Sequence, residues 1–179
     1  MAKHECECCG HLESQPCAQT MDEMEFERGI WPAALDGELS RVKSFLDRGV
    51  NFDMTDKSGY TALHYACSNG HLEVCKMLLD RGACCNKQTK AGQDTPLHRA
   101  AYRGYEDIVQ LLLEKGGDPS ICNADGQNAL HKAAERCHRG IMDLLIAQNP
   151  AILHHKDIRN RTALDMYKDM TGVNLTKIS

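Results

Sequence analysis

The chain has 179 residues, a formal net charge of −4, and 42% hydrophobic and 26% charged residues. These values suit one folded domain with a short tail and exclude a wholly disordered chain. No apolar run reaches the roughly 20 residues that a membrane span needs, so we expect no membrane partner. The net negative charge argues against a protein that binds nucleic acid through bulk charge.

The chain contains ten cysteines. Such a number is typical of disulfide scaffolds in short secreted proteins, but the start of the sequence shows no apolar stretch of a secretory signal. We therefore expect reduced thiols in a protein of the cytoplasm, the nucleus or both. We expect no cofactor.

Residues 1–19 combine cysteines and histidines within fourteen positions. Four thiols and two imidazoles could in principle surround a tetrahedral zinc ion. No second half of a zinc motif follows at the usual distance, so we favour a disordered Cys/His-rich tail and keep zinc binding as the alternative. The candidate zinc ligands are His4, Cys6, Cys8, Cys9, His11 and Cys17.

A short helix over residues 20–29 is predicted to follow this tail. Thr20 and Glu23 have the spacing of a capping box, in which two side chains hydrogen-bond each other's backbone N–H groups. This helix would lead into the repeated part of the chain.

A four-residue pattern of the type Thr-Ala-Leu-His, which we call the tetrad, occurs four times. Its copies begin at Thr61, Thr95, Asn128 and Thr162. The steps between these positions are 34, 33 and 34 residues. Each copy comes shortly after a turn residue, and a tight turn and an apolar run of helical period follow the first three copies. A complete copy therefore predicts a turn, a short helix, a tight turn, a longer helix and a loop.

Neither helix of a copy can bury its apolar stripe alone, so neighbouring copies must stack into a solenoid. Shifting the register back by 33 residues reveals a diverged first copy with a polar outer face, as expected at the end of a solenoid. The predicted repeats are residues 30–56, 57–89, 90–123 and 124–156, followed by a partial repeat over residues 157–179 that serves as the C-terminal cap.

The recurring tetrad, the alanines that follow it, the pair Gly70-His71 and the period of about 33 residues resemble ankyrin repeats over roughly residues 26–179. The resemblance implies an all-α ankyrin repeat solenoid with helix-turn-helix repeats and short β-hairpin-like turns, made of four repeats and a partial C-terminal cap. It also implies a scaffold or adaptor for protein–protein interaction that is not an enzyme.

His64, His98 and His131 occupy the last position of successive tetrads. Histidine is the commonest general base, but an active site is normally assembled once, whereas these residues recur in register. No nucleophile recurs beside them, so we predict no catalytic residues. The resemblance implies that these imidazoles link neighbouring repeats by hydrogen bonds.

Three further cysteines can be interpreted from the register of the repeats. Cys67 and Cys75 align with apolar residues and are predicted to be buried. Cys137 stands at a tight turn where two other copies have Gly70 and Gly104. A left-handed turn strains any residue other than glycine, so this position predicts either a changed turn or a cost of about 1 kcal/mol.

The resemblance implies partner binding along a concave edge that is made of the turn tips and the exposed side of each first helix. The matching positions hold eight basic and two acidic residues, although the whole chain is acidic. The predicted partner-binding residues are Lys57, Tyr60, Tyr65, Lys90, Arg99, Tyr102, Arg103, Lys132, Arg136, Arg159 and Arg161.

This edge predicts one protein partner at a time, with an acidic and partly disordered segment, because arginine and tyrosine are frequent hot spots of recognition. Two alternatives stay open. The alignment of basic residues can be accidental, since single surface charges contribute little energy, and nucleic acid can use a basic stripe. We expect the protein to be a monomer.

Overall fold

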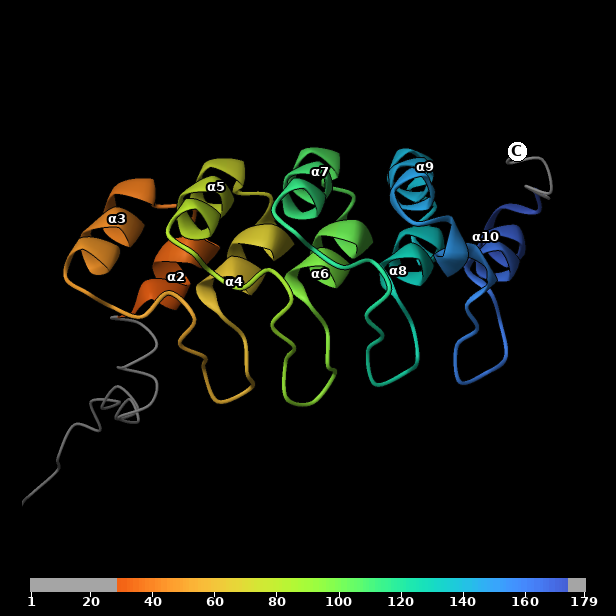
Figure 1. The fold of residues 1–179 in the computed structure, drawn as a ribbon, viewed down its shortest axis with the longest axis horizontal. Coiled ribbons are helices and arrows are strands. Elements are labelled where there is room, and N and C mark those ends of the chain that lie inside the picture. Colours follow the sequence, from red (N-terminus) through yellow and green to blue (C-terminus); the bar gives the residue numbers. More distant parts are fainter. Residues whose placement is uncertain (1–28, 174–179) are drawn as a thin grey trace, which may run out of the picture.

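The computed structural model describes residues 29–173, which form a row of stacked helix pairs (Figure 1). The predicted tail over residues 1–19 lies outside the described residues, and so does the predicted helix over residues 20–29 except for Gly29. The first helices of the pairs are α2 (Ile30–Leu35), α4 (Ala62–Asn69), α6 (Pro96–Arg103), α8 (Ala129–Glu135) and α10 (Ala163–Thr171). The second helices are α3 (Leu39–Asp47), α5 (Leu72–Asp80), α7 (Glu106–Glu114) and α9 (Arg139–Gln148), and the 3₁₀ helix η1 (Pro150–His154) follows α9.

The helices form two layers with the apolar core between them. The first helices lie side by side in one layer, and α3, α5, α7 and α9 form the other (Figure 1). Small residues such as Ala66, Ala100 and Ala133 are fully buried in the first helices, where they let neighbouring backbones approach closely. Leu78 and Leu112 of the second helices are also fully buried. None of the described helices combines the length and the apolar composition that crossing a bilayer requires.

The predicted burial of Cys67 and Cys75 is confirmed. Both side chains have no exposed surface, and their Sγ atoms lie 3.6 Å apart between α4 and α5. Burial raises the pKa of the Cys67 thiol well above its ordinary value, so the thiol stays protonated. The pair therefore packs as two small apolar side chains.

Hairpin turns project from one side of the helical layers, below the first helices in Figure 1. Backbone hydrogen bonds join consecutive tips: the Lys90 N–H donates to the Ser58 carbonyl over 3.0 Å, and the Ala124 N–H donates to the Gly92 carbonyl over 2.9 Å. The described residues contain no β-strand, and one isolated antiparallel bridge lies at the hairpin of the cap. The tips and the exposed side of the first helices together form a continuous surface, which we call the hairpin edge.

A glycine ends the first helix of successive repeats for two physical reasons. Gly104 follows α6 with a φ of 86°, a left-handed conformation that other residues rarely adopt. A Cβ atom on Gly104 would also lie 2.5 Å from the ring of His138, which belongs to the next repeat. Gly70 and the ring of Tyr105 show the same contact one repeat earlier. The glycine thus lets a ring of one repeat pack against the helix end of the repeat before it.

Cys137 occupies the corresponding position of the fourth repeat and keeps the left-handed turn, with a φ of 59°. The predicted backbone strain is therefore present, and the turn has not changed its hand. In the register of the tetrads, the position that carries a ring in His138 is filled in the cap by Gly172. A side chain is consequently tolerated at Cys137, at the cost of backbone strain.

We predict that Cys137→Gly stabilises the protein. Relief of the left-handed strain should exceed the extra entropy of glycine in the unfolded chain, and we expect a gain of about 0.5 kcal/mol in the free energy of unfolding. Urea denaturation followed by circular dichroism measures this change. Cys137→Ala is the control, because it removes the thiol and keeps the strain; an equal gain in both variants, or no gain in Cys137→Gly, would contradict the explanation.

Candidate functional site

His64, the histidine of the first tetrad, is part of a buried capping box at the start of α4. Its Nδ1 atom accepts a hydrogen bond from the Thr61 backbone N–H over 3.2 Å and lies 2.8 Å from the Thr61 hydroxyl. Because Nδ1 must accept, the proton of His64 resides on Nε2, which donates to the Asp94 carbonyl of the next repeat over 3.1 Å. His64 therefore connects a helix start to the neighbouring repeat.

The same link recurs along the solenoid. His98 Nε2 donates to the Gln127 carbonyl over 2.9 Å, and His131 Nε2 lies 3.3 Å from the Arg161 carbonyl of the cap. All three histidines are buried. The inter-repeat hydrogen bonds expected of these residues are thus confirmed, and their ring atoms face backbone groups and capping side chains.

Burial also sets the charge of these histidines. It lowers the pKa of His64 to about 4, and it lowers the pKa of His98 and of His131 below the ordinary value for histidine. The imidazoles are therefore neutral near pH 7. Protonation of Nδ1 in His64 would place its N–H group against the backbone N–H of Thr61. The imidazolium form is therefore disfavoured at this position.

The third capping box differs because Asn128 replaces threonine. A threonine hydroxyl can accept from the histidine backbone N–H and donate to Nδ1 through a single oxygen. Asn128 Oδ1 lies 2.7 Å from His131 Nδ1, but this oxygen only accepts, and Asn128 Nδ2 is buried without a hydrogen-bond partner among the described residues. The link between the fourth repeat and the cap is therefore the least well satisfied of the three.

The predicted basic residues of the hairpin edge are partly used inside the chain. Arg99 Nε donates to the Ser68 hydroxyl over 3.2 Å, and its guanidinium lies 5.5 Å from the ring centre of Tyr60 and 3.7 Å from a carboxylate oxygen of Asp94. Arg136 lies over the ring of Tyr102 at 4.3 Å and donates to its hydroxyl. Each arginine thus stacks on a tyrosine of the preceding repeat.

Tyr65 is also bound to neighbouring side chains of the chain. Its hydroxyl donates to the Asp56 carboxylate over 2.7 Å, and its ring lies 5.5 Å from that of Tyr60. Burial, together with this hydrogen bond to Asp56, raises the pKa of Tyr65 well above its ordinary value. The tyrosine therefore stays neutral, with its donor committed to a carboxylate.

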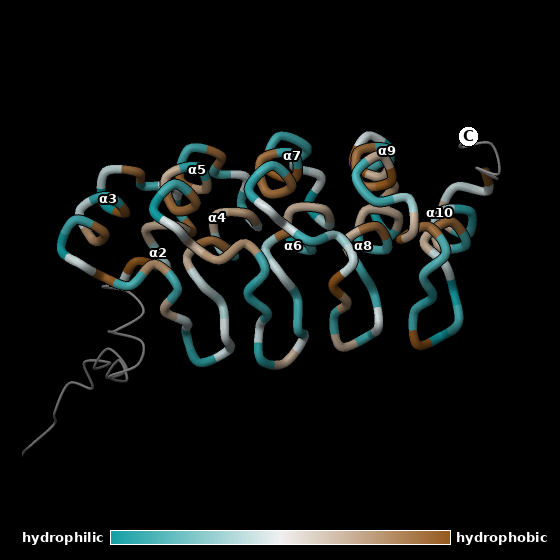
Figure 2. The backbone as a smooth tube through the Cα atoms, in the orientation of Figure 1, coloured by the Kyte–Doolittle hydropathy of each residue, from teal (hydrophilic) through white to brown (hydrophobic). Residues whose placement is uncertain are grey.

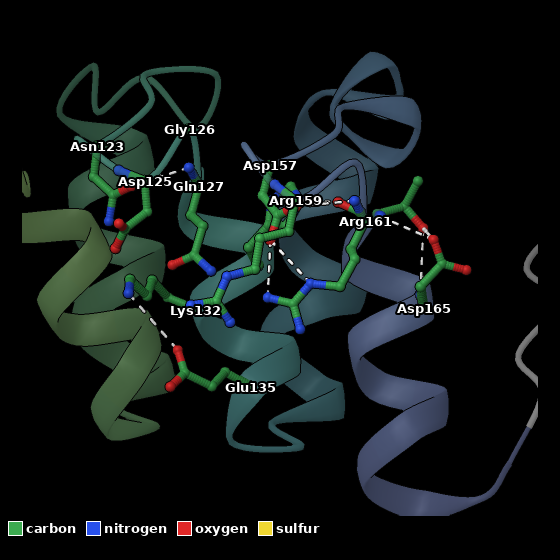
Figure 3. A network of polar contacts seen from close by, with 12 residues as sticks. Asn123, Asp125, Gly126, Gln127, Lys132, Glu135, Asp157, Arg159, Arg161 and Asp165 are labelled. Carbon is green, nitrogen blue, oxygen red and sulfur yellow. Dashed lines mark hydrogen bonds and ion pairs between the residues drawn. The ribbon is translucent and has the colours of Figure 1, made fainter.

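A network of polar contacts lies at the hairpin of the cap and includes an ion pair (Figure 3). Arg161 donates from two guanidinium nitrogens to one carboxylate oxygen of Asp157, over 3.0 and 3.2 Å. Burial works to raise the pKa of Asp157, but the backbone N–H and guanidinium of Arg161 outweigh it, so this pKa is lower than the ordinary value. Lys132 on α8 lies 3.7 Å from Glu135, which is a looser pair.

The remaining predicted cations point to solvent. Lys57, Lys90, Arg103 and Arg159 are exposed at the tips or at the end of α6. Lys90 Nζ donates to the Lys57 carbonyl over 3.1 Å, so even this side chain contacts the neighbouring tip. The exposure of the cations thus differs across the predicted site: these four are exposed, whereas Arg99 and Arg161 lie against carboxylates and are less exposed.

Sequence reasoning missed the carboxylates that hold the edge together. Asp56 and Asp157 each accept backbone hydrogen bonds from their own hairpin, and Asp94 lies beside Arg99. A signal for two of them exists in the sequence: Asp56 and Asp157 precede Gly59 and Asn160 by three residues, a spacing typical of side-chain-capped turns. The side-chain partners of these carboxylates, Tyr65 for Asp56, Arg99 for Asp94 and Arg161 for Asp157, could be seen only in three dimensions.

The candidate zinc ligands of the tail lie outside the described residues. Within residues 29–173, no group of three or more histidine, cysteine, aspartate or glutamate side chains is arranged to hold a metal ion.

Comparison with known proteins identifies the repeat. The family described as "Ankyrin repeats (3 copies)" matches residues 30–123 and 97–167. The chain belongs to the ankyrin repeat family. These matches span α2 to α10, so the stacked helix pairs and projecting hairpins described above are ankyrin repeats.

Several relatives share these ankyrin repeats. Ankyrin repeat domain-containing protein 39 of Homo sapiens is 51% identical over 83 residues, which cover 46% of this chain and 45% of that protein. The protein of the same name from Bos taurus is 55% identical over 65 residues, or 36% of each chain. Palmitoyltransferase AKR1 of Lachancea kluyveri is 39% identical over 102 residues, which cover 55% of this chain but 14% of that protein. The matched part is thus less than half the length of these relatives.

We predict that Asn128→Thr stabilises the ankyrin solenoid. A threonine hydroxyl would donate to His131 Nδ1 and remove the buried, unpartnered amide, which should raise the free energy of unfolding by about 1 kcal/mol. Thr95→Asn is the matched control, because it introduces the same mismatch at His98 and should destabilise by a similar amount. Stabilities that do not change, or that change in the opposite directions, would contradict this account of the capping boxes.

The linking histidines predict that mild acid weakens the fold. The unfolded chain takes up protons on these imidazoles near their ordinary pKa of about 6.5, whereas the folded chain keeps them neutral. The free energy of unfolding should be constant above about pH 7 and fall between about pH 7 and pH 5, by about 1 kcal/mol per pH unit for His64, and the lowered pKa values of His98 and His131 should add to this fall. Urea titrations across this range measure the slope.

His64→Gln should remove one proton from this linkage and flatten the slope. Ser44→Gln, which changes an exposed residue of α3 that carries no ionisable group, is the control and should leave the slope unchanged. A stability that does not depend on pH in this range would show that the buried imidazoles are not neutral.

Proposed function

We propose that this chain is a non-enzymatic scaffold or adaptor that binds an acidic segment of a partner protein along its hairpin edge. We propose further that it acts as a monomer in the cytoplasm, the nucleus or both. The observation that carries the proposal is the row of exposed cations on neighbouring tips, at Lys57 and Lys90, continued by Arg103 at the end of α6.

The charge balance of this region supports an acidic ligand. The nearby carboxylates are already bound: Asp56 accepts from the Tyr65 hydroxyl, and Asp94 accepts from Asn123 and lies beside Arg99. Asp94 is balanced by Arg99, and Asp56 is engaged in hydrogen bonds within its hairpin, so the exposed cations at the tips are the charges that a negative segment would meet first.

The rigidity of the edge supports binding without rearrangement. Consecutive tips are joined by backbone hydrogen bonds, and Arg99 and Arg136 are stacked on tyrosines of the preceding repeats. A partner would therefore meet groups that are already in place, which lowers the entropic cost of association.

We propose an interaction module and not an enzyme because the recurring histidines have a structural role. His64, His98 and His131 are committed to hydrogen bonds that connect repeats. The similarity to palmitoyltransferase AKR1 covers 14% of that protein and lies in the repeats, so it carries no activity over to this chain.

A pair of charge reversals tests the proposal. Lys90→Glu combined with Arg103→Glu changes two exposed residues of the hairpin edge, whereas Lys43→Glu combined with Arg48→Glu makes the same charge change on and beside α3. Both variants and the wild type are used to capture proteins from cell extract, followed by quantitative mass spectrometry and by circular dichroism to verify folding.

We expect proteins with acidic segments to be captured by the wild type and the α3 variant and to be lost with the edge variant. Their capture should also weaken at high salt, since exposed charges are screened. An unchanged set of proteins with the edge variant would overturn the proposal.

A further inference from the structure

A cleft of about 350 Å³ lies on the hairpin edge between the fourth repeat and the cap (Figure 3). The hairpin of the fourth repeat and α8 form one wall, and the hairpin of the cap and α10 form the other. Its volume suits one or two side chains of a peptide. We call it the cap cleft; the lining residues that matter below are Lys132, Ile158, Arg159, Arg161, Met166 and Met170.

Exposed apolar side chains lie around the cap cleft. Ile158 at the hairpin tip is 70% exposed, and Met170 at the end of α10 is 63% exposed. Met166 lies one helical turn before Met170 and is buried. Large apolar side chains that stay exposed around a cleft are typical of an interaction site, because their burial by a partner is favourable.

The hairpin tips change in character along the chain. The residues that follow the start of each hairpin turn are Lys57, Lys90, Ala124 and Ile158. Figure 2 shows the same trend, with a hydrophilic tip after α3 and a hydrophobic tip before α10. The hairpin edge therefore has basic residues at its first two tips and an apolar residue at the tip of the cap.

One cation of the cap cleft is available to a ligand. Arg161 is held by Asp157, and Lys132 lies near Glu135. The exposed guanidinium of Arg159 forms no ion pair within residues 29–173; its backbone N–H donates to Asp157 over 2.9 Å. The side chains of Arg159 and Arg161 both extend into the cleft in Figure 3.

The cap cleft does not suit a run of acidic residues. Asp125 and Asp169 also line it, and neither carboxylate is neutralised by an ion pair among the described residues. Several negative charges would be repelled there, whereas one carboxylate beside Arg159 would be attracted. The charge pattern and the apolar residues together specify a mixed ligand.

The walls of the cleft are fixed before a ligand arrives. The Ile158 N–H donates to the Asp125 carbonyl over 3.1 Å, which joins the two hairpins. Asp157 accepts from the backbone N–H groups of Arg159 and Arg161, each over 2.9 Å. These bonds set the positions from which Ile158 and Arg159 project, so binding requires little reorganisation.

We infer that the cap cleft binds one large apolar side chain of the partner segment, seated on Ile158 and Met170, with a neighbouring carboxylate paired to Arg159. This inference rests on the proposed function and refines it. The partner segment would combine an acidic stretch for the exposed cations of the first hairpins and α6 with an apolar anchor for the cap.

A random peptide library displayed on phage, selected on the intact 179-residue protein, tests the inference. We expect the selected peptides to combine a leucine, isoleucine, methionine or phenylalanine with an aspartate or glutamate close to it in sequence. Ile158→Lys combined with Met170→Lys should weaken the binding of a selected peptide by about tenfold or more, since two apolar contacts are lost. Arg159→Glu should also weaken it.

The controls use exposed residues away from the cleft. Leu39→Lys replaces an exposed apolar residue of α3. Arg48→Glu reverses the charge of an exposed residue that directly follows this helix. Both should leave peptide affinity unchanged. Circular dichroism shows whether each variant is folded, and a variant that unfolds is replaced by the milder Ile158→Ser or Met170→Ser.

The outcomes separate this inference from the proposed function. Selected peptides that are acidic, that lose affinity with Lys90→Glu and Arg103→Glu, and that are indifferent to the cleft variants would overturn the inference alone. Peptides that are indifferent to both sets of variants would overturn both. Binding that starts only after removal of residues 174–179, or a wild-type dimer that the cleft variants dissociate, would show that the chain itself fills the cleft and would overturn the inference.

Discussion

Stacking between neighbouring repeats is the interaction on which this structure depends. A helix pair such as α4 and α5 exposes apolar side chains on both sides until another pair covers them. Buried alanines on the first helices let neighbouring pairs pack closely and cover these apolar side chains. His64 and its counterparts hydrogen-bond the buried backbone groups at the same contacts. Each imidazole lies against the capping residue of its own helix and against a carbonyl of the next repeat, so local helix capping and long-range stacking share one side chain.

Departures from the repeat pattern gather where this stacking ends. A side chain is tolerated at the left-handed Cys137 because the cap has glycine at the position of the packing ring, and Asn128 leaves the last histidine link incompletely satisfied. Ile158 gives the last hairpin an apolar tip. The cap has no further repeat beyond it within the described residues, so its constraints are weaker, and exposed apolar side chains can remain there for another purpose.

Some charged residues of the hairpin edge stabilise the hairpins, whereas others are exposed and could contact a partner. Arg99 and Arg161 are bound to groups of the chain and help to order the hairpins. Arg103 and Arg159 are exposed, and their reversal would test recognition more cleanly than reversal of the bound arginines. A variant that changes all of these cations would mix a loss of recognition with a loss of stability.

The sequence by itself determined the repeating architecture, because a tetrad that returns every 33 or 34 residues fixes the helix starts, the capping boxes and the turn positions locally. It also determined that the histidines are structural, since they recur with the repeat. Only the tertiary structure decided which cations of the hairpin edge are available. The partners of Arg99 include Ser68 and Tyr60, and that of Arg136 is Tyr102, at separations of more than 30 residues. Such pairings depend on how one repeat is placed against the next, and the local pattern of a single repeat carries no information about them.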